Sequence, residues 1–498
     1  MKNDSKNEAS YTDKMCLIFS VTLGVTIILS LTSCNMAPKF HRPKVEIPNH
    51  YRVELKSNPD TDHKSFANIR WWEQFHDPVL NDLILNALSN NNDLKIAVAR
   101  VQEYNGILGV ISSELFPQIG ANLNKTRQQL SLETIQTIPS SFRRFNTYAA
   151  TLNAAYELDI WGRIRSSSDA AYNDYLAQIE VRRTVVLMLV TRVASSYIEL
   201  RKLDNQLEIS VSTLTSRIEA ERIAKARFDE GLTSELEYKQ AQSETESAII
   251  AIKLYEILIP QQENLISVLV GSPPGLIERG LTLETLGMPP NIPVGIPSEL
   301  LYQRPDIHQA EDELVAANFR IGVARAAFFP DISLTGYYGN QSAELHNLLT
   351  SKALAFGTAA NLFQPLFTGG RLISQLEIAK AIKSEACYRY RQTILNALQE
   401  VNDDLIAHKI NLELVVEQKK QVEIFRRYRY LAELQYNNGQ SDYLNVLDAE
   451  RRLFEAQLLL ADTEANSFTS LINLYKALGG GWIIEADNFS MMVTDGCI

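Results

Sequence analysis

The sequence predicts a mostly α-helical protein built from two similar halves, each of which also carries amphipathic β-strands. Three observations support this fold class. Motifs of the first half return in the second, each half contains a very long run without glycine or proline, and each half contains segments of alternating polarity. Because the offset of roughly 210 residues is far longer than a solenoid repeat, we interpret the chain as a duplicated half-protein.

The duplication rests on motifs that keep their order in both halves. The first pair of motifs covers 105–120 and 318–333, and the later ones recur at a similar spacing. The matching residues are Asn105/Asn318, Gly109/Gly322, Val110/Val323, Phe116/Phe329, Pro117/Pro330, Ile119/Ile332, Gly162-Arg163/Gly370-Arg371, Phe228/Tyr436, Gly231/Gly439, Leu236/Leu444 and Ala241/Ala449.

Composition narrows the class of protein. The chain has 498 residues, of which 45% are hydrophobic and 21% charged, as is typical of a folded protein. Its net charge of -11 argues against a nucleic-acid partner, which usually leaves a basic footprint. The four cysteines lack metal-ligand spacing.

An apolar stretch near the start of the chain predicts a signal peptide. Residues 15–31 carry no charge, and their length of about 17 residues falls short of the roughly 20 that a membrane-spanning helix needs. The Leu-Thr-Ser-Cys sequence that follows resembles the bacterial lipobox, in which the cysteine is acylated. We therefore predict a signal peptide over 1–33 and lipid attachment at Cys34, while Asn35 favours sorting to the outer membrane.

Each half is predicted to contain a long helical hairpin. The runs 164–230 and 372–438 contain neither glycine nor proline, and each would be roughly 100 Å long at 1.5 Å per residue. Apolar residues recur every seven positions, as in supercoiled helices, at Val186, Val193, Leu200, Leu207 and Leu214. Gly231 and Gly439 then end these helices, and second helices follow near 233–269 and 441–478.

Segments of alternating polarity predict two strands in each half. Tyr148 to Leu158 alternate with polar residues over a length that suits a membrane strand, apolar on the outside and polar inside. The first half adds a strand at 119–124, the second half adds strands from Ile332 to Tyr338 and from Phe356 to Leu366, and the polar connector 125–146 is predicted to be an extracellular loop. An ordinary surface hairpin is the alternative. Because four strands cannot close a barrel and open edges are not tolerated in lipid, strands that cross a membrane require copies of the chain to associate.

The stretch 300–330 resembles the signature of the TolC-like outer-membrane factors, in their NodT/OprM-type lipoprotein branch. The residues that carry the resemblance are Leu300 to Ile307, Ala316-Ala317-Asn318 and Ile321 to Pro330. Further matching motifs are Trp71-Trp72, Glu157 to Arg163, Leu366 to Arg371 and the segment from Tyr436 to Ala449. Together these motifs cover about 34–480, and their order is more specific than any one of them.

The resemblance implies a homotrimer with a twelve-stranded β-barrel in the outer membrane, a twelve-helix tunnel across the periplasm and a mixed equatorial region. It implies a passive efflux duct that joins an inner-membrane pump of the RND type through a periplasmic adaptor. On this basis the first half of the chain divides into a signal peptide (1–33), a lipid-anchored segment with the first equatorial part (34–115), a first strand hairpin (116–161) and a first helical hairpin (162–270). The second half divides into a linker with the second equatorial part (271–328), a second strand hairpin (329–369), a second helical hairpin (370–478) and a tail (479–498).

The same resemblance assigns candidate functional residues at the hairpin tips. A periplasmic gate is expected at Leu444, Asp448 and Tyr436, since Asp448 matches a family aspartate that repeats around the three-fold axis and Leu444 lies one turn earlier on the same face. The alternative is that Asp448 is an ordinary solvated carboxylate on the helix surface. The adaptor is expected to dock on Gly231, Leu232, Thr233, Gly439, Gln440 and Ser441.

Other conspicuous residues have structural explanations. Arg304-Pro305-Asp306 is interpreted as a helix start, because proline suits the first helical position and an anion is favoured there. Trp161 and His408 are expected to pack rather than to bind a ligand. We find no phosphate loop, metalloprotease motif or nucleophile elbow, so we expect no enzyme, no catalytic residue, no metal and no cofactor.

Two other functions remain open from the sequence. The same duct could serve type I secretion of a protein, or export of a siderophore. A periplasmic adaptor or scaffold lipoprotein without a pore is the alternative from another class, although adaptors carry a single hairpin and the duplication argues against it. Substrate choice resides largely in the inner-membrane pump, so the sequence does not reveal the substrate.

Overall fold

The computed structural model describes residues 35–52, 70–131, 144–286, 297 and 300–480. Cys34 and the predicted signal peptide lie outside the described residues. The chain forms two compact units, one containing Gln102–Leu176 and Glu311–Arg389, and the other containing Ala177–Ala310 and most of the chain from Tyr390 onward. The helices α3 (Asn92–Ser113), α4 (Arg163–Asp229), α7 (Pro305–Ala326) and α8 (Arg371–Asn437) contribute residues to both units.

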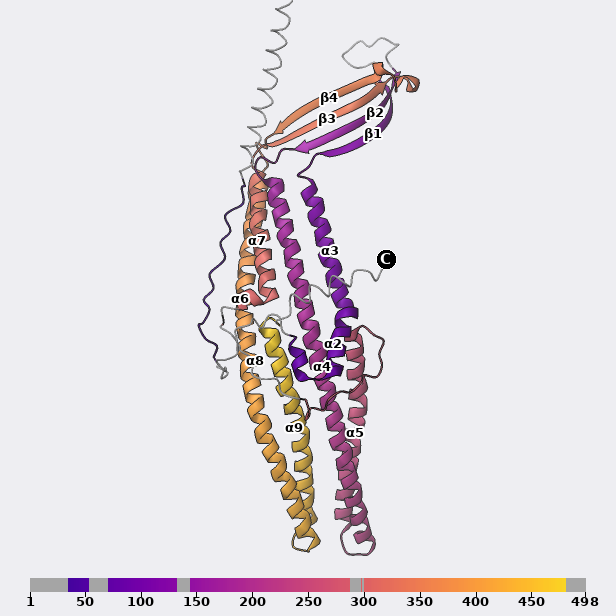
Figure 1. Cartoon of the computed structure of the whole chain (residues 1–498), viewed down its shortest axis with the longest axis vertical. Coiled ribbons are helices and arrows are strands. Elements are labelled where there is room, and N and C mark those ends of the chain that lie inside the picture. Colours follow the sequence, from indigo (N-terminus) through magenta and orange to yellow (C-terminus); the bar gives the residue numbers. More distant parts are fainter. Residues whose placement is uncertain (1–34, 53–69, 132–143, 287–296, 298–299, 481–498) are drawn as a thin grey trace, which may run out of the picture. The chain divides into compact units, whose positions relative to one another are not determined.

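The first unit contains a four-stranded antiparallel sheet in the order β1-β2-β3-β4, visible in Figure 1. Its strands are β1 (Gln118–Gln129), β2 (Arg144–Glu157), β3 (Asp331–Ser342) and β4 (Leu354–Phe363). Short 3-10 helices η4 (Leu345–Asn347) and η5 (Ser351–Ala353) join the last two strands. The connector between β1 and β2 is shorter than the predicted 125–146, because the strands extend into it at both ends. The prediction that the last strand extends to Leu366 was wrong, because β4 ends at Phe363. Pro365 follows two residues later and has no backbone N–H to donate to a hydrogen bond between strands.

The two faces of this sheet differ in polarity. Residues that are paired directly across neighbouring strands point to the same side of the sheet. One such row contains Ala121, Leu152, Tyr338 and Phe356. The large apolar side chains on this face are exposed, including Leu123 at 83%, Leu152 at 55% and Phe356 at 73%. The opposite face carries amide, hydroxyl and small side chains at Asn122, Thr151, Asn153, Thr335, Gly339 and Asn361. The predicted alternation is confirmed.

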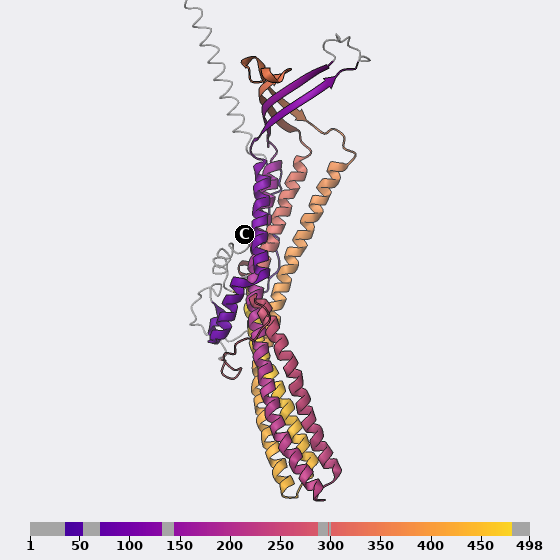
Figure 2. The same cartoon turned by 90° about the vertical axis from the view of Figure 1, so that its right-hand side faces the viewer.

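The second unit is helical. It contains the lower parts of α4 and α8 with α5 (Glu235–Val270) and α9 (Tyr443–Ala477), so that each half forms a helical hairpin (Figures 1 and 2). The elements η1 (Trp71–Phe75), α2 (Pro78–Asn90) and α6 (Leu300–Gln303) complete it. Both long helices have 67 residues, which confirms the predicted runs. No helix in the described part of the chain has a stretch long and apolar enough to cross a membrane.

Aromatic and acidic residues in and beside η1 hold α2 in this unit. Trp71 stacks on Tyr475 of α9 with ring centroids 5.0 Å apart. Asp77 caps α2 by accepting from the backbone N–H of Val79, and its other oxygen accepts from the hydroxyl of Tyr197 at 2.8 Å. Trp71, Asp77, Tyr197 and Tyr475 are all buried, so these contacts anchor the connecting elements on α4 and α9.

Candidate functional site

The two hairpin tips have the same backbone geometry. Gly231 and Gly439 both adopt φ +70°, a left-handed conformation that strains any other residue. At the first tip the backbone N–H of Leu232 donates to the carbonyl oxygen of Arg227 at 2.8 Å. The N–H of Gln440 donates to Gln435 in the same way at 2.9 Å. These bonds satisfy helix-end carbonyl groups as in a Schellman motif, so the turns follow from the glycines.

The predicted docking residues lie at these tips and are largely accessible. Gly231, Gly439 and Gln440 are exposed, and Leu232 is 71% exposed, whereas Thr233 and Ser441 are half-buried. Thr233 donates through its hydroxyl to the carboxylate of Glu237. Ser441 accepts from the amide of Asn445 at 2.7 Å.

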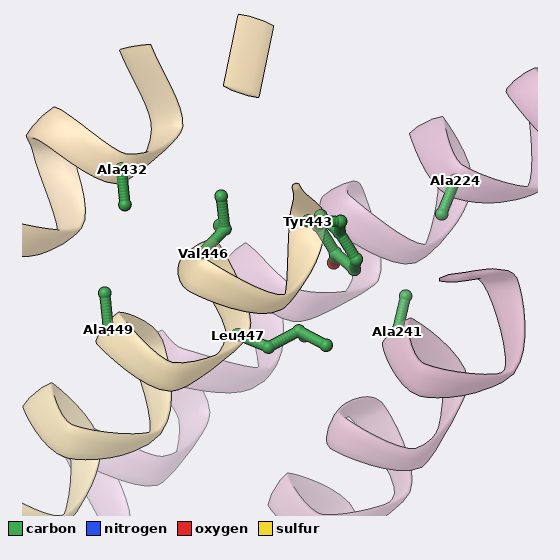
Figure 3. Close-up of a cluster of buried hydrophobic side chains, with 7 residues drawn as sticks. All are labelled: Ala224, Ala241, Ala432, Tyr443, Val446, Leu447 and Ala449. Carbon is green, nitrogen blue, oxygen red and sulfur yellow. The ribbon is translucent and has the colours of Figure 1, made fainter. Parts of the chain in front are cut away.

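A buried cluster behind the tips joins the two hairpins. Figure 3 shows Tyr443 and Leu447 of α9 pointing toward Ala224 of α4 and Ala241 of α5. Val446 and Ala449 of the same helix turn toward Ala432 of α8. Four alanines allow the helices to approach closely around the larger side chains. The inner face of α9 is therefore occupied by packing within one chain.

Leu444 and Asp448 lie on the other face of α9. Leu444 is 60% exposed, and the side chain of Asp448 is 43% exposed. Asp448 forms an ion pair with Arg452 at 2.8 Å and accepts from the hydroxyl of Tyr428 at 3.3 Å. The carboxylate is therefore partly neutralised within its own chain. The sequence analysis did not identify Arg452, although its spacing of one helical turn from Asp448 could have suggested it.

Tyr436 is placed differently from the other two gate candidates. It is half-buried, its hydroxyl donates to Glu237 of α5 at 3.3 Å, and the guanidinium of Arg227 in α4 lies 4.8 Å from its ring centroid. Burial and the nearby Glu237 carboxylate raise the pKa of its phenol. Tyr436 therefore links the second hairpin to the first rather than sharing the exposed face of α9. Sequence reasoning missed Glu237 and Arg227, because their contact with Tyr436 is formed only in the fold.

A buried ion pair fastens the first hairpin above the tip. Arg217 of α4 and Glu244 of α5 are 2.9 Å apart, with side chains 3% and 9% exposed. Arg451 of α9 also reaches Glu244, at 2.7 Å, and the Arg217 guanidinium lies over the ring of Phe454. Burial lowers the pKa of Arg217 despite the nearby carboxylate. No pattern in the sequence indicated this contact, because the three helices that form it meet only in the fold.

The Arg304-Pro305-Asp306 segment has the structural role that was predicted. Pro305 is the first residue of α7, and Asp306 lies in its first turn. Arg304 is buried, forms an ion pair with Asp306 at 2.6 Å and donates to the carbonyl oxygen of Ala477 at 2.8 Å. A cation at the end of α9 is favoured by the helix dipole, so Arg304 joins the start of one helix to the end of another.

Trp161 and His408 pack as expected. Trp161 stacks on Phe329 with ring centroids 4.6 Å apart and donates to the carbonyl oxygen of Pro330. His408 is 5% exposed and lies against the hydroxyl of Ser470. Burial lowers the pKa of its imidazole. Among the described residues, no group of His, Cys, Asp or Glu side chains is arranged to hold a metal ion.

Comparison with known proteins supports the class that this fold suggests. The family model of the outer membrane efflux proteins matches residues 83–272 and 296–480. The solvent efflux pump outer membrane protein SrpC of Pseudomonas putida is 35% identical over 469 residues, which cover 93% of this chain and 99% of the relative.

Two solved channels share the fold. The open state of the MtrE outer membrane channel of Neisseria gonorrhoeae has a TM-score of 0.80 at 30% identity, covering 90% of this chain and 99% of that one. The CmeC outer membrane channel of Campylobacter jejuni has a TM-score of 0.86 at 24% identity, covering 92% and 98%. The fold is thus that of an outer-membrane channel protein.

The chain belongs to the outer membrane efflux protein family, and it is the outer-membrane channel component of an efflux system. The predicted family, fold class and function are confirmed. This assignment also decides against the pore-free adaptor lipoprotein that the sequence had left open. The family is one of channels rather than of enzymes.

Proposed function

We propose that three copies of this chain form one passive exit duct, with a barrel of strands in the outer membrane and a helical tunnel in the periplasm. The observation that carries the proposal is the sheet, which exposes an apolar face. Within the described chain, its two outer strands, β1 and β4, each pair with a neighbour on one side only, so that each leaves one edge unpaired. Lipid suits such a face but does not tolerate unpaired strand edges. Association of copies satisfies both requirements, because it pairs the edges while leaving the apolar face to the lipid.

Apolar residues on the helical hairpins support association of copies through the helical unit as well. Ile250, Leu254 and Ile257 follow one face of α5 and are 68%, 52% and 57% exposed. On α8, Ile410 and Ile424 are 44% and 66% exposed. Exposed apolar side chains that gather on one face, as on α5, mark interaction sites on proteins that are otherwise soluble. Contact between copies in the tunnel would bury them.

The N-terminal segment supports a lipid anchor at Cys34. Asn35, the next residue, accepts from the hydroxyl of Ser166 in the first turns of α4 at 3.0 Å. The carbonyl oxygen of Pro38 accepts from the amide of Asn318 at 2.7 Å, and Ala37 lies so close to Gly322 that a Cβ there would be 2.8 Å from it. The segment is thus fixed near the junction of β2 and α4, a suitable place for acyl chains to enter the bilayer beside the strands.

In this proposal the hairpin tips meet a periplasmic adaptor that connects the duct to an inner-membrane pump of the RND type. The adaptor would contact Gly231, Leu232 and Thr233 on one tip, and Gly439, Gln440 and Ser441 on the other. Leu444 and Asp448 would line the periplasmic gate, and their exposure on α9 supports that assignment. Tyr436 would hold the gate closed through Glu237. The duct would need no cofactor and would carry out no catalysis.

Accumulation of fluorescent dyes and antibiotics in cells that lack the protein tests the function. We expect accumulation to rise in the deletion strain and to return to normal when the wild-type chain is supplied. A Cys34→Ser chain should restore less efflux, and labelling with an alkyne palmitate analogue should mark only the wild type. Unchanged accumulation across a broad panel would contradict small-molecule efflux and favour dedicated secretion of a protein or siderophore.

A further inference from the structure

The charged residues of the four-stranded sheet are separated by sign along its strands. Figure 1 shows that β1 leads to β2, and β3 to β4, at the end of the sheet away from the helices, which we call the far end. Within the strands, the only acids are Glu157 and Asp331, each at the strand terminus nearest the helices. The only bases are Lys125, Arg127 and Arg144, all toward the far end. The two ends of the sheet therefore differ in charge.

The bases toward the far end have neutral partners. The ammonium group of Lys125 lies 5.5 Å from the ring centroid of Tyr148, and Arg144 donates through Nε to the amide oxygen of Gln129 at 2.7 Å. Among the described residues, no carboxylate forms an ion pair with Lys125, Arg127 or Arg144. All three side chains are exposed. Their positive charge is therefore available to an anion from outside the chain.

All three bases lie on the apolar face of the sheet. Residues two apart along a strand share a face, so Lys125 and Arg127 continue the side that carries Leu123. Arg144 is paired with Gln129 and lies on the same side. Because Gln129 follows Arg127 by two residues, Arg127 and Arg144 are diagonal neighbours, roughly 7–8 Å apart along the backbone. We call these three residues the basic patch.

The apolar face changes its chemistry in a fixed order toward the far end. On β1, Ile119 and Leu123 are 76% and 83% exposed. Tyr148 follows on β2, paired with Lys125, and the two arginines of the basic patch lie beyond them. A membrane strand passes through the same order, from a hydrocarbon band to an aromatic girdle and then to the headgroups. The basic patch is therefore placed at the depth of lipid headgroups.

We propose that the basic patch binds the phosphate groups of a glycolipid in the outer leaflet of the outer membrane. The inference rests on the proposed function, in which the apolar face meets lipid, and on the prediction that the connection between β1 and β2 is extracellular. A guanidinium group binds phosphate through two parallel N–H donors. Arg127 and Arg144 are close enough to hold one phosphate between them, and Lys125 adds a third positive charge beside it.

The neighbouring side chains favour a lipid over a soluble anion. Leu123 precedes Lys125 by two residues on the same face, and Leu152 lies four residues from Tyr148 on β2. These leucines are 83% and 55% exposed. Acyl chains attached to a bound headgroup would cover them, whereas free phosphate would leave them in contact with water. The basic patch and the apolar band are thus one continuous surface for one amphipathic ligand.

Binding of lipid A, the phosphorylated glycolipid of the outer leaflet, tests the proposal. We would titrate lipid A into the full-length assembly in mild detergent and follow the bound lipid by native mass spectrometry. EDTA keeps divalent cations from occupying the phosphate groups. Each base beside an anionic lipid surface strengthens binding roughly fivefold, so Arg127→Gln with Arg144→Gln should weaken it roughly twentyfold. Because the substituted side chains are exposed, the double variant should keep its melting temperature in lipid-free detergent.

An exchange of two adjacent residues supplies the matched control. Arg127→Gln with Gln128→Arg keeps the net charge but moves the guanidinium group to the polar face, since successive residues of a strand point to opposite sides. This exchange variant should lose roughly fivefold in affinity, as Arg127→Gln alone should. Binding equal to that of the wild type would show that only the overall charge matters, and would overturn the proposed site.

Three further results would also overturn the site. The first is equal binding of lipid A by the wild type and the double variant. The second is equal binding of lipid A whose phosphate groups have been removed. The third is a rise in melting temperature with inorganic phosphate alone that the double variant lacks, because this result would assign the basic patch to a soluble anion.

Flotation with phosphatidylcholine vesicles distinguishes a failure of this inference from a failure of the proposed function. An assembly of several copies that enters these vesicles yet does not prefer lipid A would contradict the glycolipid site alone. A protein that stays monomeric in mild detergent and enters neither phosphatidylcholine vesicles nor vesicles containing lipid A would contradict the proposed duct itself.

Discussion

The two helical hairpins have nearly the same backbone at their tips, but one is stabilised by a buried ion pair and the other by apolar packing. Fourteen residues before its tip glycine, the first hairpin has Arg217, which is buried against Glu244. The second has Phe425 at that position, packed on an apolar cluster of Val422, Leu453 and Ala456. The tips differ as well, with Asp229 and Glu230 on the first and Asn437 and Asn438 on the second. Duplication has kept the turn geometry while the side chains have diverged.

The largest effect is expected when the buried pair of the first hairpin is broken. Arg217→Met leaves Glu244 without its buried partner, and such losses cost about 3–5 kcal/mol. Arg451 would remain as a second, more exposed partner of the carboxylate. Phe425→Met in the second hairpin keeps an apolar side chain of similar size and should cost below roughly 1.5 kcal/mol. Thermal unfolding followed by circular dichroism measures both, and equal losses would contradict the difference between the hairpins.

Substitution of either tip glycine by alanine should lower the stability of the protein by a similar amount. Gly231→Ala and Gly439→Ala each force a residue with a side chain into φ +70°, at a cost of about 1–2 kcal/mol. No atom of a neighbouring group lies within 4 Å of a Cβ added at either position, so only the backbone is strained. Matching shifts in melting temperature are therefore expected. Clearly unequal shifts would show that one tip relaxes where the other does not.

The proposed gate residues of α9 should affect ion conductance, whereas the residues at the corresponding positions of α5 should not. We expect Leu444→Ala with Asp448→Ala to raise the ion conductance of the protein several-fold in planar bilayers, because in the proposed assignment these two exposed side chains narrow the gate. Leu236 and Gln240 occupy the same positions after the first tip glycine, and their alanine variants serve as the matched control. Conductance that is unchanged by the α9 pair, or raised equally by the α5 pair, would disprove the gate assignment.

The smallest effect concerns pH. Partial burial raises the pKa of Asp404 in α8 to about 6, opposed by Lys476 and aided by Glu400. A raised carboxyl pKa means that the folded state holds the proton more tightly, so this contribution to stability is present in acid and is lost as the pH rises through about 6. The melting temperature should therefore fall less between pH 4 and pH 7 in Asp404→Asn than in the wild type. Ser196 holds the corresponding position in the first hairpin, so no matching contribution arises there.

Local sequence determined the elements and their repetition. Runs without glycine or proline fixed both long helices, Gly231 and Gly439 fixed the turns, and alternating polarity located the strands, because these patterns act over a few residues. The start of α7 at Pro305 was predictable for the same reason. Along β4, Pro365 was the local signal that should have excluded Leu366 from the strand.

Only the tertiary structure decided which side chains meet between elements. The contact of Tyr436 with Glu237, the ion pair Arg217–Glu244 and the hydrogen bond from Tyr428 to Asp448 depend on how α4, α5, α8 and α9 pack. A sequence pattern reports the period of one helix, whereas its rotation against a neighbour is set by the summed packing of many side chains, such as the alanines around Tyr443. The turns at Gly231 and Gly439 were therefore predictable from local sequence, whereas the contacts that join the helices behind them became known only from the structure.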